Sequence, residues 1–264
     1  MVVGCFIYNN AKKTVNTKIH EAVESIDYEI SKRKTEENDP LNILILGIDS
    51  KTDESGRSDS LKVMTLKPET YSMQLISIPR DTRTMIAGKG IKDKINHAYA
   101  FGGDSMVIDT VENFLGIDIE YHVHINIQGL EELIDELGDV TVMNDVEWTD
   151  SHYEFNKGPV EFGGKKELAY VWMRKKDPNG DFGREERQRD IVKAIVEKGA
   201  NIASIEKVNN TINILGSNLA TSLDFDDMKQ LLASYTGTCK NIESYQLQGT
   251  GTTIDGILLS NPRR

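Results

Sequence analysis

The sequence predicts an α/β fold, a three-layer α/β/α sandwich around a central mixed sheet. Residues 42–49 form a nearly continuous apolar run that ends in Asp49, which is typical of a strand buried on both faces. Helical and strand patterns then alternate through residues 104–143. A strand covered on both faces, together with this alternation, indicates helices on both sides of one sheet.

Two further strands follow the buried run. Residues 61–66 and 73–78 are strand-like, and a turn around Pro68 separates them. Because the connection is so short, the two strands should form an antiparallel hairpin, which makes the sheet mixed.

The remaining elements follow from periodicity and from their end signals. Residues 104–115 have apolar positions at helical spacing, an Asp or Ser cap and a closing Gly116. The other expected elements are a strand at 121–127, a helix at 128–137, a strand at 140–143, a loop-rich stretch at 144–165, helices at 166–173 and 184–198, one or two helices within 202–232, and weak strands near 242–248 and 254–259.

The N-terminal segment differs from the rest of the chain. Residues 1–8 are apolar but too few to span a bilayer, which takes about 20 residues. Residues 14–37 are polar and helix-prone, with isoleucine and valine at three- to four-residue spacing, so we expect a juxtamembrane or stalk helix. Residues 1–8 could be the end of a truncated anchor or an ordinary disordered or strand-like N-terminus. The predicted organisation is this segment with the stalk at 1–37, followed by a folded domain at 38–264.

Composition limits the classes of function. The chain has 264 residues, 38% of them hydrophobic, so it can bury a sizeable core. Its net charge of −11 argues against a nonspecific nucleic-acid surface, which needs a basic face. The two cysteines are far apart, and the sequence has no CxxC or Cys/His ligand spacing, so neither a disulfide framework nor a zinc site is indicated.

A cluster of arginines marks the start of the helix at 184–198. The loop 177–183 leads into it, and Arg184 and Gln188 share a face with the apolar Ile191. The first turn of a helix already carries positive partial charge, so cations there need a negative partner. A bound phosphate would supply one, and a solvated helix end with Arg–Glu pairs is the alternative.

Carboxylates and further cations follow the predicted strands. Asp49 closes the first strand and Asp59 opens the next, so the two could converge at the sheet edge and hold Mg²⁺. The alternative is that both are loop caps. Arg80 and Lys94 add positive charge near strand ends.

His122 and His124 share one face of a predicted strand. They could form a metal pair, although the sequence shows no third ligand.

Five motifs together resemble the LytR-CpsA-Psr family, over roughly residues 40 to 250. They are Gly47-Ile-Asp49, Gly56-Arg-Ser-Asp-Ser60, Ser77-Ile-Pro-Arg-Asp-Thr82, Lys94-Ile-Asn-His-Ala-Tyr99 and Asp177-Pro-Asn-Gly-Asp-Phe-Gly-Arg184-Glu-Glu-Arg187-Gln188. The likeness is to the branch that transfers wall teichoic acid in Gram-positive bacteria. It implies a phosphotransferase that moves an anionic glycopolymer from an undecaprenyl-pyrophosphate carrier to peptidoglycan, on the extracytoplasmic side of the cell membrane behind a single N-terminal anchor.

The resemblance also implies roles for individual residues. Asp49 and Asp59 would hold Mg²⁺, and Arg80 and Asp81 would be catalytic, with Asp81 a candidate proton acceptor. The residues expected to bind the pyrophosphate are Arg57, Arg80, Lys94, Arg174, Arg184 and Gln188, with Arg187 either joining them or bracing the helix. Trp172 stands where the family often has an arginine, so one phosphate ligand is missing.

Two other functions fit the same residues. A pyrophosphatase would use water as the acceptor in place of a glycan hydroxyl. A non-catalytic lipid- or glycan-binding regulator of the cell envelope would bind the carrier without turnover. A DNA-binding regulator fits less well, because the chain is acidic and has no recognisable DNA-binding motif.

Overall fold

The computed structural model describes residues 2–48, 58–138, 140–150, 152–163, 165–199, 211–254 and 257–262. Its centre is a six-stranded sheet in the order β11-β6-β1-β2-β3-β12. The strands are β1 (Leu41–Ile48), β2 (Ser58–Lys67), β3 (Ser72–Ile78), β6 (Tyr121–Asn126), β11 (Leu219–Thr221) and β12 (Ile242–Gln246). Because β1 runs parallel to β6 and antiparallel to β2, the predicted mixed sheet is confirmed.

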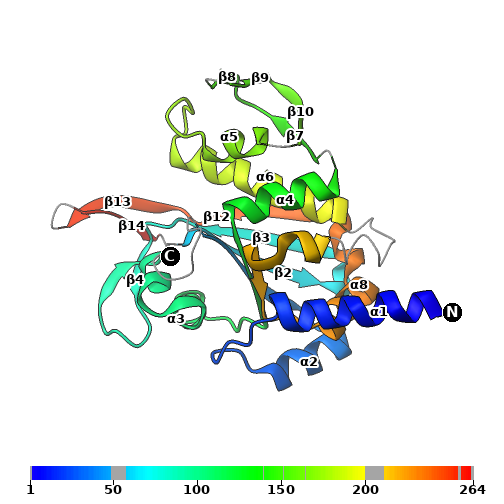
Figure 1. The fold of residues 1–264 in the computed structure, drawn as a ribbon. Coiled ribbons are helices and arrows are strands. Elements are labelled where there is room, and N and C mark those ends of the chain that lie inside the picture. Colours follow the sequence, from blue (N-terminus) through cyan, green and yellow to red (C-terminus); the bar gives the residue numbers. More distant parts are fainter. Residues whose placement is uncertain are drawn as a thin grey trace.

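Helices cover both faces of this sheet, as the sequence predicts (Figure 1). On one side lies α3 (His97–Leu115), and on the other lie α4 (Ile127–Leu137), α5 (Lys166–Trp172) and α6 (Asp181–Gly199). α8 (Phe225–Ser234) and residues 211–215, which are helical, complete the helices of the C-terminal part.

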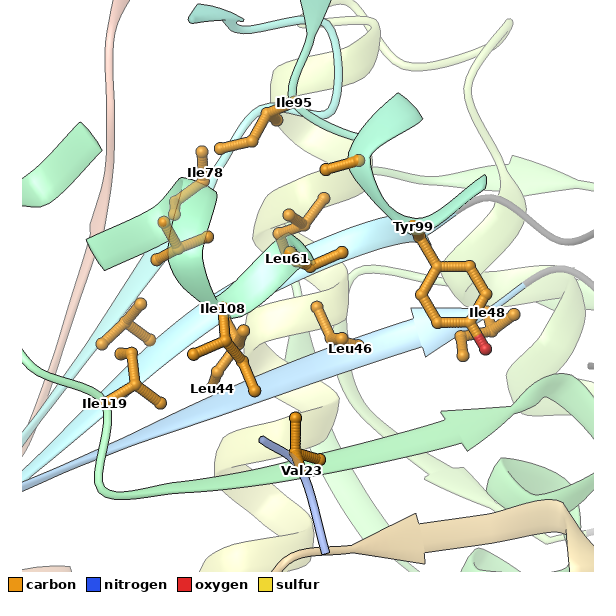
Figure 2. Packing of buried hydrophobic residues seen from close by; sticks show 14 of the residues in the cluster. Val23, Leu44, Leu46, Ile48, Leu61, Ile78, Ile95, Tyr99, Ile108 and Ile119 are labelled. Carbon is orange, nitrogen blue, oxygen red and sulfur yellow. The ribbon is translucent and has the colours of Figure 1, made fainter. Parts of the chain in front are cut away.

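The main core lies between the sheet and α3. Figure 2 shows Leu44, Leu46 and Leu61 of β1 and β2 packing against Ile108 of α3. These side chains are 0–1% exposed, so β1 is buried as its continuous apolar run predicts. Burying a leucine fully contributes roughly 1.5–3 kcal/mol, which makes this face the stable base of the domain.

A second core supports the helices on the other face. Short hairpins form from β7 (Val140–Asn144) with β10 (Gly158–Phe162) and from β8 (Trp148–Thr149) with β9 (Glu154–Phe155). They occupy most of the stretch predicted as loop. Their aromatic side chains pack on Tyr170 of α5 and Ile191 of α6, so this layer fixes both helices.

The stretch predicted as one stalk helix over residues 14–37 is broken. α1 (Val2–Thr14) continues through a π-helical turn (Val15–Ile19), residues 20–27 are not helical, and α2 (Tyr28–Glu37) follows. His20 forms a bridge to Thr221, and Val23 and Ile26 are buried in the main core. The isoleucine and valine spacing therefore reflects packing on the domain and not one continuous helix face.

α1 also lies against the domain. Tyr8 packs edge-on against Phe225 of α8, and Lys12 forms an ion pair with Asp226 at 2.6 Å. Within the described part of the chain, no helix is both long enough and apolar enough to cross a membrane.

Two small hairpins add strands that the sequence did not predict, and only the strand expected near 254–259 overlaps one of them. β4 (Arg83–Met85) pairs with β5 (Lys92–Lys94), and β13 (Gly249–Ile254) pairs with β14 (Ile257–Pro262). The β13–β14 hairpin projects from the sheet in Figure 1. A bridge between Thr82 and Ser260 brings it to the end of β3, so it borders the site described next.

Candidate active site

An apolar cavity lies between the sheet and helix α6. Its walls include Ile45 of β1, Ile125 of β6, Val171 of α5 and Ile191 of α6. The polar residues that line it are Asp59, Ser60, Lys62, Asn126, Arg184 and Gln188. Along α6 the lining changes from apolar Ile191 through Gln188 to cationic Arg184, as the helix periodicity predicts.

A β-bulge directs Asp59 toward this cavity. Gly47 pairs with Ser60 but Ile48 pairs with Ser58, so Asp59 is an extra residue in β2. Bulges of this kind redirect a side chain, and here both Asp59 and Ser60 line the cavity. Gly47 is required opposite, because a Cβ there would lie 2.9 Å from the Ser60 side chain.

Arg80, Asp81 and Lys94 meet beside the bulge. Arg80 Nη1 donates to Asp59 Oδ1 at 3.0 Å, and Lys94 Nζ donates to Asp81 Oδ1 at 2.6 Å. Burial lowers the pKa of Arg80, but the charge and hydrogen bond of Asp59 together with the charges of Asp81 and Asp181 outweigh burial, so the pKa is raised. The residues expected to be catalytic therefore adjoin the expected metal ligand Asp59.

Helix α6 begins three residues earlier than predicted, at Asp181. Its carboxylate forms ion pairs with Arg184 at 2.8 Å and with Arg174 at 2.8 Å. Asp181 thus supplies the negative partner that the cationic first turn needs when no anion is bound. The prediction that the helix begins with arginines is wrong in this respect, because the spacing did not reveal the earlier N-terminus.

Arg184 is the residue at which three hollows meet. It lines the apolar cavity, a basic hollow with Arg174, Lys175 and Lys176, and a third hollow with Arg80 and Asp81. Its side chain is only 11% exposed. Its Nε is buried and has no hydrogen-bond partner among the described residues, so one donor of Arg184 is unused within the fold.

The charges around Arg184 do not cancel. The described cations are Arg80, Lys94, Arg174 and Arg184, and their carboxylate partners are Asp59, Asp81 and Asp181. Lys175 and Lys176 add two cations in the basic hollow, and Asp150 and Glu185 add two carboxylates in the hollows. Six cations against five carboxylates leave a positive charge beside an apolar cavity. An amphiphile with an anionic head is the ligand class that suits this combination.

Known proteins resemble this chain over nearly its whole length. The model of the LytR_cpsA_psr family matches residues 3–263. The chain belongs to the LytR-CpsA-Psr family.

Two relatives similar to this chain are named as teichoic acid transferases. The polyisoprenyl-teichoic acid–peptidoglycan teichoic acid transferase TagU of Bacillus subtilis is 43% identical over 255 residues, covering 96% of this chain and 82% of its own. The TagU of Halalkalibacterium halodurans is 44% identical over 264 residues, covering 96% and 85%. These identities show that the chain is an enzyme of the transferase class.

Solved structures of the family support the fold. The crystal structure of B. subtilis TagU superposes with a TM-score of 0.70 at 41% identity, covering 85% of this chain and 90% of that one. The structure of TagT bound to LIIa-WTA gives a TM-score of 0.78 at 28% identity, covering 92% and 93%. The α/β sandwich predicted from the sequence is therefore the fold of this LytR-CpsA-Psr protein.

Arg187 does not line any of the three hollows described. It is 5% exposed, and its guanidinium donates to Asp177 and to the backbone oxygens of Tyr170 and Met173. It also lies over the Trp148 ring, 5.2 Å from the centroid. Gly183 lies directly beneath Asp177, and a side chain there would overlap the carboxylate. Of the two roles expected for Arg187, the structure favours bracing the helix.

Lys62 is a cavity residue that the sequence analysis missed. It is 1% exposed, and its Nζ donates to Ser60 Oγ at 2.5 Å and to Gln188 Oε1 at 3.3 Å. Burial lowers the pKa of Lys62 to about 7, although nearby Glu185 opposes this. Within its strand it reads as an ordinary alternating polar residue, and only the pairing with Ile45 shows that it faces the cavity.

Part of the predicted metal and phosphate site lies outside the described residues, namely Asp49 and Arg57. The described part fits a hard cation: Asp59 offers a carboxylate at the cavity, and the neighbouring Ser58 Oγ is buried with no hydrogen-bond partner among the described residues. Trp172, at the family's arginine position, is 43% exposed and lines both the apolar cavity and the basic hollow.

Proposed function

We propose that this protein transfers an anionic glycopolymer, a teichoic acid, from a polyprenyl-pyrophosphate carrier to peptidoglycan. The observation that carries the proposal is the position of Arg184, where an apolar cavity joins two charged hollows. The lipid chain would occupy the cavity, the pyrophosphate would lie at Arg184, and the polymer would leave over the hollows. The names of the TagU relatives and the WTA-bound TagT structure support the same substrate class.

The pyrophosphate would replace protein carboxylates as the ion-pair partner of the arginines. Arg80, Arg174 and Arg184 are each paired with a carboxylate within the protein. A diphosphate brings charge to these guanidinium groups, which bind planar oxyanions with two parallel hydrogen bonds. Gln188 would add an amide from the next turn of α6, and Lys94 and Arg57 would complete the cationic set.

The reaction is phosphoryl transfer to a hydroxyl. An acceptor sugar oxygen attacks the phosphorus that carries the polymer, and the bond from that phosphorus to the bridging oxygen breaks, which releases the lipid phosphate. Negative charge grows on the leaving oxygens, and Arg80 and Arg184 would stabilise it. Asp81 would accept the hydroxyl proton, since it lies beside Arg80 at the rim of the site.

Mg²⁺ belongs to this proposal as the cofactor. Asp59 and Asp49 would hold it, and when bound it neutralises charge on the diphosphate oxygens. The extracytoplasmic location, the N-terminal membrane anchor and the division at residue 38 between stalk and catalytic domain are also part of the proposal.

The test uses the protein with a synthetic lipid-linked pyrophosphate glycan. Labelled glycan is expected to appear on a peptidoglycan acceptor only when acceptor, Mg²⁺ and wild-type protein are all present. Release of free glycan phosphate at the same rate without acceptor would instead identify a pyrophosphatase. Binding of the lipid with no product under either condition would contradict the transfer proposal and leave a carrier-binding protein.

A further inference from the structure

A second cluster of polar side chains lies on the opposite face of the sheet from the cavity. His122 and His124 of β6 pair with Leu44 and Leu46 of β1, whose side chains form the α3-facing core. Asp104 of α3 meets them from the helix side. The third ligand that the sequence did not show therefore comes from a residue about 20 positions earlier in the chain.

The three side chains converge inside the protein. Asp104 Oδ2 lies 3.2 Å from His122 Nε2 and 2.8 Å from His124 Nδ1. The His122, His124 and Asp104 side chains are 0%, 11% and 9% exposed. One ligand atom from each lies within 4.8 Å of the other two, which is the spacing of a three-ligand metal centre.

Hydrogen bonds alone leave this cluster incomplete. Despite the 3.2 Å separation, His122 Nε2 makes no hydrogen bond with acceptable geometry, and His122 Nδ1 is also unpaired among the described residues. Asp104 Oδ1 is buried and likewise accepts no hydrogen bond there. A buried polar atom without a partner is destabilising. A cation bound in the cluster would give a partner to His122 Nε2 and, through a bidentate carboxylate, to Asp104 Oδ1.

The backbone of α3 supports this arrangement. Helical geometry is interrupted at Gly102 and Gly103, and Asp104 is the next residue. The sequence predicts Asp104 or Ser105 as the cap of a helix starting there. A helical segment does begin after Gly103, as predicted, and a shorter segment starting at His97 precedes the kink. The Asp104 carboxylate is directed at the histidines of β6.

We propose that Asp104, His122 and His124 form a transition-metal site that binds Zn²⁺ or a similar divalent ion and joins α3 to β6. Two imidazoles and one carboxylate suit zinc, which takes bonds of about 2.0–2.2 Å to both. Tetrahedral ligands at these lengths are about 3.3 Å apart. The 3.2 Å between Asp104 and His122 is close to this spacing, and the 2.8 Å between Asp104 and His124 would widen on metal binding. This site is separate from the Asp59 region and does not depend on the transfer activity.

The first experiment measures binding to tag-free protein. After dialysis against EDTA and then Zn²⁺, metal analysis is expected to give one zinc per chain in the presence of excess Mg²⁺. Titration with Co²⁺ is expected to give the visible spectrum of a nitrogen- and oxygen-ligated ion. Zinc at a hundredfold excess over its Kd is expected to raise Tm by about 5–10 °C.

Variants decide which residues bind. His124→Asn and Asp104→Asn are each expected to weaken Zn²⁺ binding about 100-fold or more and to remove the Tm increase. His152→Asn, at the exposed His152–Asp150 pair, is the matched control and should bind like the wild type. If the wild type binds no zinc, or if both cluster variants keep its affinity, the cluster is a hydrogen-bonded His–Asp–His network and the proposal is wrong.

Discussion

Arg184 and Arg187 lie one turn apart on α6, yet they meet two different environments. Arg184 faces the hollows, and its ion-pair partner Asp181 is shared with a second arginine. Arg187 faces α5 and the 173–177 loop, where a carboxylate, two carbonyls and two aromatic rings enclose it. Arg184 therefore keeps an unused donor beside the hollows, whereas each nitrogen of the Arg187 guanidinium donates to a partner within the fold.

The largest expected effect is a loss of stability when the enclosed Arg187 is removed. Arg187→Ala leaves the Asp177 carboxylate buried and without its ion pair, and breaking such a pair costs about 3–5 kcal/mol. Chemical denaturation should show this loss in the free energy of unfolding. Glu186→Ala, at the exposed neighbouring position, is the control and should change it by less than about 0.5 kcal/mol. A stable, inactive Arg187→Ala would place Arg187 with the substrate-binding residues instead.

Substitution of Arg184, beside the cavity, should reduce activity and leave stability unchanged. Arg184→Ala is expected to reduce glycopolymer transfer by about 100-fold or more, because loss of a donor that stabilises transition-state charge has effects of this size. Stability should be unchanged, since burial already lowers the pKa of Arg184 and Asp181 keeps Arg174 as a partner.

Arg184→Lys sharpens this test. It keeps the charge but loses the planar fork, so an intermediate rate is expected. Full activity in the alanine variant, measured with the lipid-linked substrate, would remove Arg184 from the site.

The sequence predicts the elements of this fold better than the environments of individual buried residues. Strand periodicity and helix caps predict the sheet and most helices, because these signals are local. Helix spacing also separates Arg184 and Gln188 from Arg187. Lys62 and Asp104 could not be assigned, since their environments depend on strand register and on how α3 returns to β6.

Glu167 is a buried acid on α5, the helix that packs against Arg187. Glu167 is 0% exposed, both its carboxylate oxygens lack partners among the described residues, and burial raises its pKa from 4.5 to about 7. Between pH 4.5 and 7 the folded state therefore holds the proton more tightly than the unfolded state, and stability falls as the pH rises through this window.

Glu167→Gln should remove this penalty. We expect its free energy of unfolding to exceed that of the wild type by about 3 kcal/mol at pH 8 and to match it closely near pH 4.5. Denaturation curves at the two pH values measure the difference, with the exposed Glu161→Gln as control. An equal gain at both pH values would show that ionisation of Glu167 is not the cause.

The smallest effect concerns Lys62, at the boundary between core and cavity. Its pKa of about 7 means that it adds a positive charge to the cavity at pH 6 and is mostly neutral at pH 8. Affinity for a pyrophosphate lipid is therefore expected to fall several-fold between these values, beyond the change seen in Lys62→Met. Lys62→Arg, which stays charged, should show no larger change in affinity between the two pH values than Lys62→Met. If Lys62→Met shows the same pH dependence of affinity as the wild type, a group other than Lys62 causes that dependence.

The close contact of Gly183 with Asp177 has a consequence for protein engineering. The linear stretch from Asp177 to Gln188 is not a portable anion-binding motif, because its geometry depends on carbonyls of Tyr170 and Met173 and on the Trp148 ring. A graft into another scaffold would have to bring α5 and the β8–β9 hairpin with it. The smallest transferable unit is thus about 40 residues long, running from Trp148 to Gln188.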